Sequence, residues 1–209
     1  MSPKDAYHHG NLRRALLDEA LVVIGERGVA ELSLRELSAR LGVSHAAPYH
    51  HFADKAALLH ALAHEGMAEM DDVIASAVEE SGADPLDRLL ALATSYVMFA
   101  VEHRDYYLAF TSHDMEGLQA NGSGPEEGGG AVWRRLMSVV LECQRAGELP
   151  PGDPLVIAVE LWSLVHGLAG LWQMGPLRRM PQATDGPRPL VETVLRTTLG
   201  MQCQSDRKK

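Results

Sequence analysis

Helical periodicity runs along almost the whole chain, and this feature constrains the fold most. Apolar residues recur three and four positions apart, as on one face of an α-helix, and no run shows the alternation of a half-buried strand. The sequence therefore predicts an all-α protein. The expected helices cover residues 11–27, 34–41, 45–51, 55–80, 85–102, 106–110, 131–146, 154–173 and 190–202.

Polar residues mark where several of these helices should begin. Ser33 and Glu36 have the spacing of a capping box, in which each side chain bonds the other's backbone N–H. Ser44, Asp54 and Asp84 stand just before the expected starts of three further helices, and the last is followed by proline. These signals predict helix boundaries independently of the apolar pattern.

Composition excludes several broad classes of protein. The 209 residues suit one or two domains, and 46% apolar with 22% charged residues excludes wholesale disorder. A net charge of −9 excludes a polybasic coat for nucleic acid. Two cysteines, Cys143 and Cys203, make a disulfide scaffold unexpected, and the first ten residues contain no apolar signal-peptide core. We therefore expect a cytoplasmic protein.

Charge is unevenly distributed along the chain. The first 55 residues hold seven Lys and Arg, seven Asp and Glu, and five of the ten histidines. The remainder holds 12 basic and 21 acidic residues. This asymmetry predicts two roles, one of them compatible with an anionic partner.

Residues 33–52 have the pattern of a helix-turn-helix. The expected helices 34–41 and 45–51 are joined by the three-residue turn Gly42-Val43-Ser44. The second helix of such a motif can enter the DNA major groove. The spacing alone fits any compact three-helix domain equally well.

The residues of this motif resemble the signature of TetR-type transcriptional regulators. The resemblance rests on the Leu-Gly-Val-Ser turn at 41–44, Tyr-His-His-Phe at 49–52, and Asp54-Lys55 followed by Leu58. Further on, Trp162, His166 and Gly167 are similar to the Trp-His-Gly signature of one C-terminal class of the family. The resemblance implies a homodimer with a helix-turn-helix DNA-binding domain at 9–70 and a larger helical ligand-binding and dimerisation domain at 84–203.

Carried onto this chain, the resemblance makes residues 45–51 the recognition helix for a palindromic operator in double-stranded DNA. The residues expected at the DNA are Ser33, Arg35, Ser44, His45, Ala46, Tyr49, His50, His51 and Lys55. His45 and Ala46 should reach base edges, Ala46 only through an apolar contact. Pro48 stands where the family more often has an N–H donor, so we expect a distorted or 3₁₀-like opening of this helix. Few polar groups face the bases, which favours partial readout of DNA shape.

The second half of the chain concentrates aromatic and histidine residues on its expected helices. The candidate ligand-binding residues are Tyr96, Phe99, His103, Tyr107, Phe110, Trp133, Met137, Trp162 and His166. Each also fits ordinary core packing. The set predicts a pocket for a small lipophilic or aromatic effector, and the resemblance favours a repressor whose operator affinity falls when the effector binds. An activator remains the alternative role on the same fold.

The helix expected at 154–173 is apolar on nearly every side and almost long enough to cross a membrane. Glu160 and His166 lie within it, so burial in a core and a subunit interface is the preferred reading. An apolar stripe on the last helix should complete a four-helix interface between two copies. Its residues are Leu190, Val191, Val194, Leu195, Thr198 and Leu199.

No sequence motif for catalysis is found. The best candidate for a metal site is the pair His60 and His64, four residues apart on one helix face, with His113, Asp114 and Glu116 as further ligand types. The His-Glu-x-x-His motif is missing, so His60 and His64 are expected to form a solvated or an interdomain face. We predict neither enzyme activity nor a cofactor or metal. A helical ligand- or metal-binding protein without DNA affinity is the remaining alternative.

Overall fold

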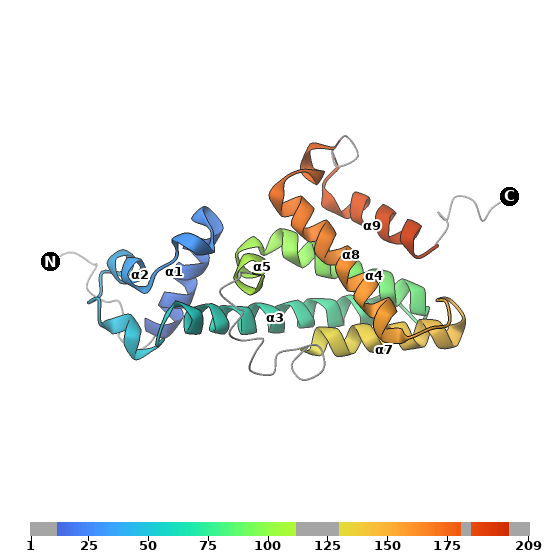
Figure 1. Cartoon of the computed structure of the whole chain (residues 1–209), viewed down its shortest axis with the longest axis horizontal. Helices are drawn as coiled ribbons and strands as arrows, with labels where there is room; N and C mark the ends of the chain where they lie inside the picture. Colours follow the sequence, from blue (N-terminus) through green and yellow to red (C-terminus); the bar gives the residue numbers. More distant parts are fainter. Residues whose placement is uncertain (1–11, 112–129, 181–184, 201–209) are drawn as a thin grey trace. The chain divides into compact units, whose positions relative to one another are not determined.

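The computed structural model describes residues 12–111, 130–180 and 185–200, and every regular element in these ranges is helical (Figure 1). The prediction of an all-α protein is confirmed. The α-helices are α1 Leu12–Arg27, α2 Leu34–Leu41, α3 Lys55–Glu80, α4 Pro85–Glu102, α5 Arg104–Phe110, α7 Ala131–Ala146, α8 Pro154–Met174 and α9 Pro187–Thr198. Short 3₁₀ turns are η2 Val29–Glu31, η3 Ala47–His50 and η5 Leu177–Arg179.

Most of the predicted caps hold. Ser33 Oγ accepts the N–H of Glu36 at 3.1 Å, and Asp54 Oδ1 accepts that of Ala57 at 2.8 Å. Asp84 likewise caps α4 through the N–H groups of its first turn. The capping box is only half formed, because the Glu36 carboxylate pairs with Arg27.

Several predicted features lie outside the described residues. These are Asn11, the possible metal ligands His113, Asp114 and Glu116, Cys203, and the end of the last helix beyond residue 200.

The chain divides into two compact units. Unit 1 comprises residues 1–66 and 105–122, and unit 2 comprises 67–104 and 123–209. The chain passes from one unit to the other within α3, after Arg104 at the start of α5, and again after residue 122. The local sequence pattern did not predict that α5 groups with the helix-turn-helix region.

Unit 1 packs α1 against α2 and η3. Helix α1 buries Leu16, Ala20, Val23 and Ile24, which recur three and four positions apart along the helix. They meet a core that also contains Leu37, Phe52 and Leu58. This core holds the short elements that carry the candidate DNA-binding side chains.

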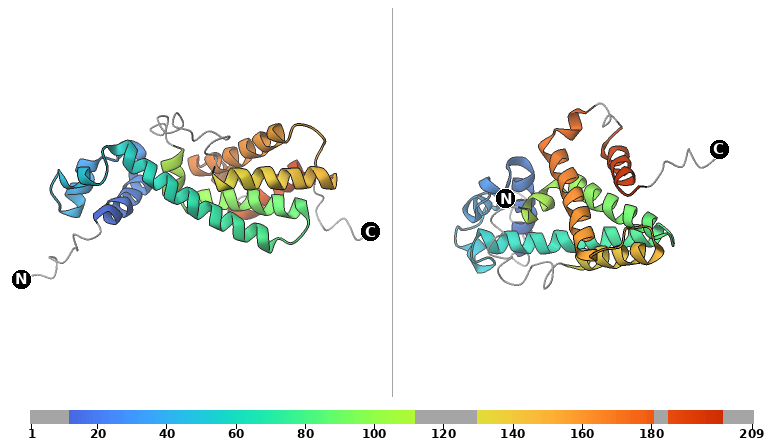
Figure 2. Two further views of the ribbon diagram at one scale, coloured as in Figure 1. Left: turned by 90° about the horizontal axis from the view of Figure 1, so that it is seen from below. Right: turned by 45° about the vertical axis from the view of Figure 1, so that its right-hand side comes forward.

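Unit 2 is built around α4, which packs against α7, α8 and α9 (Figure 2). Residues on every side of α4 are buried, from Leu89 through Ala100. Val191 and Leu195 of α9 are buried inside this unit. Two residues of the stripe that we assigned to the subunit interface therefore belong to the protomer's own core, because α9 turns them toward α4.

Helix α8 is long and apolar enough to cross a membrane by length and composition alone. It buries Ala158, Leu161, Val165, Leu168 and Ala169 within unit 2. Its other face exposes large apolar side chains, including Leu155, Val156, Val159, Trp162 and Leu171. One stripe of the helix thus belongs to the core, and a second stripe is left uncovered within a single chain.

Candidate DNA-binding and effector sites

The predicted recognition helix, residues 45–51, does not form an α-helix. In place of a helix over 45–51, the structure has a turn followed by the four-residue 3₁₀ turn η3. Ser44 does not cap it with its side chain, because Ala46 is the residue at its N-cap. The predicted distortion at Pro48 is present, and the buried proline ring sits within η3 itself.

The residues predicted to contact DNA lie mostly on the surface of unit 1. Arg35, Ser44, His45, Ala46, His50 and His51 are exposed, and Tyr49 is 56% exposed despite its large aromatic ring. Lys55 is half-buried at the start of α3. Ser33 is committed to capping α2. Buried Phe52, with the Arg13 guanidinium 5.4 Å from its ring centre, anchors the chain directly after this surface.

One of these side chains is held by a hydrogen bond that the sequence did not indicate. The Oγ atom of buried Ser38 lies 2.8 Å from His45 Nδ1 and 2.7 Å from the carbonyl oxygen of Arg35. A hydroxyl carries a single proton, which Ser38 donates to that carbonyl, so it accepts from His45 Nδ1–H. This assigns the proton of a neutral His45 ring to Nδ1 and leaves Nε2 as an outward-facing acceptor.

A half-buried polar network connects three helices of unit 1. Glu65 on α3 accepts from Arg14 Nη1 of α1 at 2.6 Å and from the Tyr106 hydroxyl of α5. Burial alone would raise the pKa of Glu65, but the hydrogen bonds from Arg14 and Tyr106 outweigh it and lower the pKa. Glu65 is therefore a charged link between the first helix and the helix that follows α4.

Gly66 makes this arrangement possible. A Cβ atom at this position would lie 2.7–2.9 Å from three atoms of the Tyr106 side chain. Because such distances are too short for carbon atoms, only glycine lets the Tyr106 ring rest directly on the α3 backbone. Sequence reasoning missed this residue, since nothing in the local pattern shows that a distant ring will cover it.

An aromatic cluster forms the candidate effector site of unit 2. Tyr96 Oη lies 3.1 Å from the ring nitrogens of His166, and the Trp162 ring meets His166 edge-on at 4.8 Å between centroids. Trp133 of α7 packs edge-on against Trp162 at 6.0 Å. The cluster joins α4, α7 and α8, and Trp162 remains 40% exposed.

His166 is the polar centre of this cluster. Burial lowers its pKa, although a hydrogen bond with the backbone of Trp162 opposes the shift. The ring is therefore neutral near pH 7. A neutral imidazole beside a tyrosine hydroxyl can exchange hydrogen bonds with a ligand without placing a charge in an apolar site.

The other predicted ligand residues are distributed differently. Phe99 is buried and stacks on His103, with 4.4 Å between ring centroids. Met137 is half-buried on α7. Tyr107 and Phe110 contact each other and belong to unit 1. Four of the nine candidates, Tyr96, Trp133, Trp162 and His166, thus form one connected group.

The end of α4 is fastened to α8 close to where the chain leaves unit 2. Gln173 Oε1 accepts from Arg104 Nη1 at 2.8 Å, and its Nε2 donates to the carbonyl of Ala100. His103 ends α4, with its backbone N–H bonded to Phe99. A shift of α8 would therefore change the hydrogen bonds of Gln173 with Ala100 and Arg104, where α4 ends and α5 begins.

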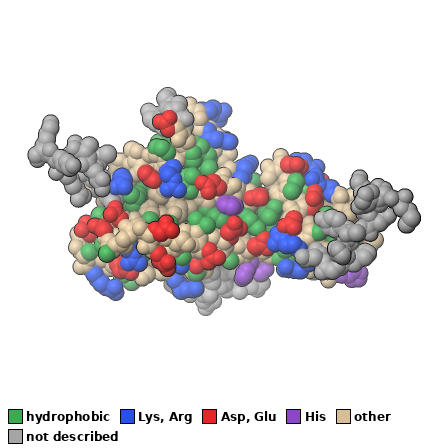
Figure 3. All heavy atoms as spheres, turned by 180° about the vertical axis from the view of Figure 1, so that it is seen from behind, with side chains coloured by type: hydrophobic (Ala, Val, Ile, Leu, Met, Phe, Trp, Pro, Cys, Tyr) green, Lys and Arg blue, Asp and Glu red, His purple; other side chains and the backbone are tan. Residues whose placement is uncertain are grey.

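Acidic and basic side chains are mixed on the face of the molecule seen in Figure 3, with apolar side chains among them. On the helix-turn-helix, Arg27 pairs with Glu36, and Arg40 with Glu19. Within the described ranges, no three His, Cys, Asp or Glu side chains come together as a metal would require, and His60 and His64 are exposed.

Comparison with known proteins identifies the family. Residues 16–62 match the family described as "Bacterial regulatory proteins, tetR family", and residues 89–198 match "Tetracyclin repressor-like, C-terminal domain". The chain belongs to the TetR family. The two matches cover the helix-turn-helix with the start of α3, and the helices from α4 to α9.

Individual relatives agree with this TetR assignment. The uncharacterized HTH-type transcriptional regulator YobS of Bacillus subtilis (strain 168) is 32% identical over 100 residues, or 48% of this chain and 51% of the relative. The chain thus matches about half the length of this curated relative. A protein of unknown function from Rhodococcus sp. RHA1 is 36% identical, with a TM-score of 0.71 over 93% of this chain and 96% of that one.

A more distant TetR-like fold has been solved with its ligands. The structure of AibR in complex with isovaleryl coenzyme A and operator DNA has 20% identity and a TM-score of 0.63, covering 88% of this chain and 96% of that one. At this identity the similarity concerns the fold. The narrower assignment to the Trp-His-Gly class of TetR proteins stays a prediction.

Proposed function

We propose that the protein is a homodimeric, DNA-binding transcriptional repressor that releases its operator when a small apolar or aromatic effector binds unit 2. The proposal rests mainly on one observation in this member of the TetR family. The side chains on η3 and on the residues beside it are largely exposed, as contact with DNA requires. Here polar and aromatic side chains project from a segment that is itself anchored by buried Pro48 and Phe52.

Because η3 has only four residues, it can contact few base pairs directly. A single 3₁₀ turn presents few side chains to a groove, and His45 is the polar group whose orientation is fixed by a protein hydrogen bond. With Nε2 as acceptor, neutral His45 complements the amino groups of cytosine N4 or adenine N6 in the major groove. Tyr49, His50 and Lys55 are assigned to the phosphate backbone, which sets affinity more than sequence preference.

The uncovered face of α8 supports the homodimer. Val156 is 53% exposed and Val159 41%, and both lie on the stripe of α8 that faces away from α4. An apolar stripe of this kind is stabilised when a two-fold partner presents the same stripe. We assign the interface to α8, with Leu190, Val194 and Leu199 of α9 contributing from its edge. Glutamate in place of Val159 should yield monomers at micromolar concentration by light scattering.

The Tyr96–His166–Trp162–Trp133 cluster is assigned to the effector. It combines large apolar surfaces with two groups that can form hydrogen bonds, which is the usual make-up of a small-molecule site. The AibR complex supports the principle that one such fold engages both a small molecule and operator DNA.

Two of the covalent paths between the effector unit and the DNA-binding unit run through described helices. One is α3, and the other is the α4–α5 junction, where Gln173 holds Arg104 on the side of unit 2 and Tyr106 contacts Glu65 on the side of unit 1. An effector that favours one position of α8 over another changes the equilibrium between DNA-competent and DNA-incompetent dimers. Arg14 and Tyr106 both donate hydrogen bonds to Glu65. A displacement of Tyr106 would therefore change the position of Glu65 and, through Arg14, that of α1.

The direct test is recovery of genomic DNA fragments by the purified protein, followed by a salt titration of the best fragment. We expect one or a few palindromic sites, with a log–log salt slope of about −0.9 per phosphate neutralised. His50→Ala should reduce affinity, and the exposed His60→Ala on α3 serves as the matched control. Weak binding without sequence preference, unchanged by His50→Ala, would contradict the proposal.

A further inference from the structure

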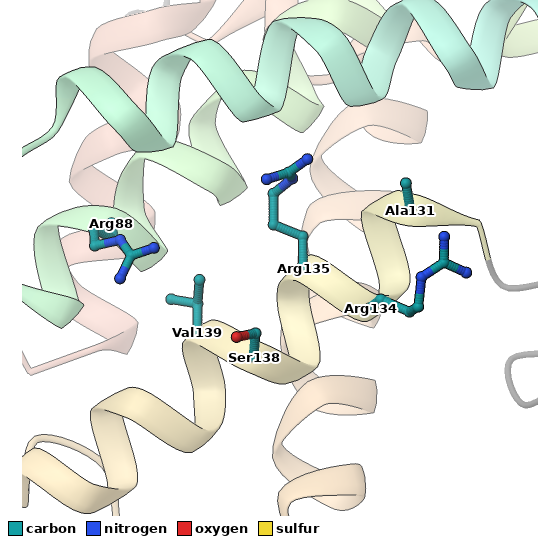
Figure 4. A pocket seen from close by; sticks show the side chains of 6 residues that line it. All are labelled: Arg88, Ala131, Arg134, Arg135, Ser138 and Val139. Atoms are coloured by element: carbon teal, nitrogen blue, oxygen red, sulfur yellow. The ribbon is translucent and has the colours of Figure 1, made fainter.

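We propose that unit 2 binds a small phosphate-bearing anion in a hollow between α4 and α7, separate from the aromatic cluster. The hollow has a volume of about 320 Å³, which falls in the range of small-molecule sites, roughly 300–1,000 Å³. Figure 4 shows that one lining residue comes from α4 and five from α7. They are Arg88, Ala131, Arg134, Arg135, Ser138 and Val139.

The hollow carries more positive than negative charge. Three guanidinium groups line it, and two carboxylates hold two of them: Glu142 pairs with Arg88, and Asp71 pairs with Arg135. Arg134 is exposed and forms no ion pair with any residue in the described part of the chain. One positive charge is therefore left over in a protein whose net charge is −9.

Asp71 and Glu142 hold Arg135 and Arg88 in place, but each arginine keeps N–H groups that donate to neither carboxylate. Arg135 donates to Asp71 through Nε and Nη2, at 3.2–3.3 Å, so Nη1 takes no part in the pair. These contacts are longer than the 2.7–2.9 Å or so of strong charge-assisted bonds. Arg88 uses Nη1 on Glu142, whose second oxygen accepts from Ser138 Oγ at 3.2 Å. Donor groups on both helices thus remain for a ligand.

Phosphate fits these donors better than other common anions. A planar guanidinium fork matches the oxygen geometry of phosphate. The hollow also lies at the N-terminal half of α7, whose N-cap, Gly130, has no side chain to occupy the positive end of the helix dipole. Ala131 and buried Val139 complete the lining with small and apolar surface.

Calorimetric titration of the full-length protein with inorganic pyrophosphate tests this site directly. At low salt we expect saturable binding of one pyrophosphate per chain, weakening as salt is raised. Arg134→Gln should weaken binding about tenfold, since it removes a charged donor with no structural partner. Arg145→Gln is the matched control, because Arg145 is exposed on the same helix but does not line the hollow.

The outcomes separate clearly. Saturable binding that Arg134→Gln weakens and Arg145→Gln leaves intact supports the site. Absence of saturable binding at millimolar pyrophosphate, or equal losses in both variants, overturns it. The titration contains no DNA, so its result is independent of whether the protein is a repressor.

Discussion

The two units present their candidate functional groups in opposite ways. In unit 1, the candidate DNA-binding side chains project from a short turn, and buried Pro48 and Phe52 pack into the core. In unit 2, Tyr96 and His166 of the candidate effector site take part in the packing between α4 and α8 themselves. The candidate DNA-binding surface can therefore be altered with little cost to folding, whereas a change at Tyr96 or His166 also changes the core.

The units also differ in what fastens their helices. Unit 1 joins α1, α3 and α5 through the charged Glu65 and its two donors. Unit 2 joins α4, α7 and α8 through aromatic contacts together with polar ones, such as the ion pair of Arg88 with Glu142 and the hydrogen bond from Gln173 to Ala100. The aromatic cluster is therefore the feature of unit 2 that has no counterpart in the Glu65 network of unit 1.

The largest effect is expected where unit 1 is tightest. Gly66→Ala places a methyl group against Tyr106 and should destabilise the protein by about 2 kcal/mol, the usual cost of overpacking. Thermal unfolding followed by circular dichroism measures this change. Displacing Tyr106 also breaks its hydrogen bond to Glu65, so the effector should release DNA less completely.

Gly25→Ala is the control for Gly66→Ala. Gly25 is exposed within α1, and a Cβ there would find its nearest neighbour at 3.9 Å, an ordinary contact. Alanine should stabilise the helix by about 0.5–1 kcal/mol at this position. Equal destabilisation by both substitutions would show that Tyr106 does not rest on Gly66.

A second experiment addresses the outward-facing side of unit 1. His45→Ala should weaken binding to a selected operator about tenfold, as expected for losing one base contact of about 1.4 kcal/mol. Stability should fall by no more than about 1 kcal/mol, because the His45 side chain is exposed and Ser38 Oγ keeps its hydrogen bond to the Arg35 carbonyl. Ser38→Ala removes the acceptor that fixes the ring, so the preference for cytosine or adenine at one position of each half-site should be relaxed. Selection of DNA from a random pool measures both effects, and a site unaffected by either variant would contradict the assignment.

The third prediction concerns pH and unit 2. Since burial lowers the pKa of folded His166, the unfolded chain binds a proton more readily, and stability falls as pH drops below about 6.5. The contribution is fully present above that pH. Denaturant unfolding at pH 7.5 and 5.5 should show a smaller loss for His166→Gln than for the natural protein, by at most about 1.4 kcal/mol per pH unit. Exposed His60→Gln should not reduce the loss.

The smallest effect is expected in the core of α4. Thr94 Oγ1 is buried and has no hydrogen-bond partner among the described residues. Thr94→Val keeps the shape and removes the unpartnered hydroxyl, so it should stabilise the protein by about 1 kcal/mol. Loss of stability would show instead that this hydroxyl has a partner in solution, such as a bound water.

Features set by neighbouring residues could be predicted from the sequence. The caps at Ser33, Asp54 and Asp84 and the end of α2 at Gly42 follow from local hydrogen bonds and from backbone preferences. Helix α7 begins and ends at the predicted residues for the same reason. The distortion at Pro48 was also expected from the missing N–H, although its full extent, a 3₁₀ turn in place of a helix, was not.

Features set by distant residues could not be predicted. Glu36 has the spacing of a capping box, but Arg27, nine residues earlier, competes for its carboxylate. The contacts of Ser38 with His45, of Gly66 with Tyr106 and of Asp71 with Arg135 depend on how helices pack. Periodicity places residues on a face of a helix but does not specify which other helix will meet that face. For the same reason, Val191 and Leu195 were assigned to the wrong surface.

The uncovered stripe of α8 has a consequence for how the stability of this protein depends on its concentration. If two copies bury that stripe together, part of the free energy of the native state is supplied by mass action. The unfolding midpoint then rises with concentration, and dilution shifts the population toward chains with exposed valine and tryptophan. In a cell, the number of copies would therefore influence how long each copy survives as well as how much operator is occupied.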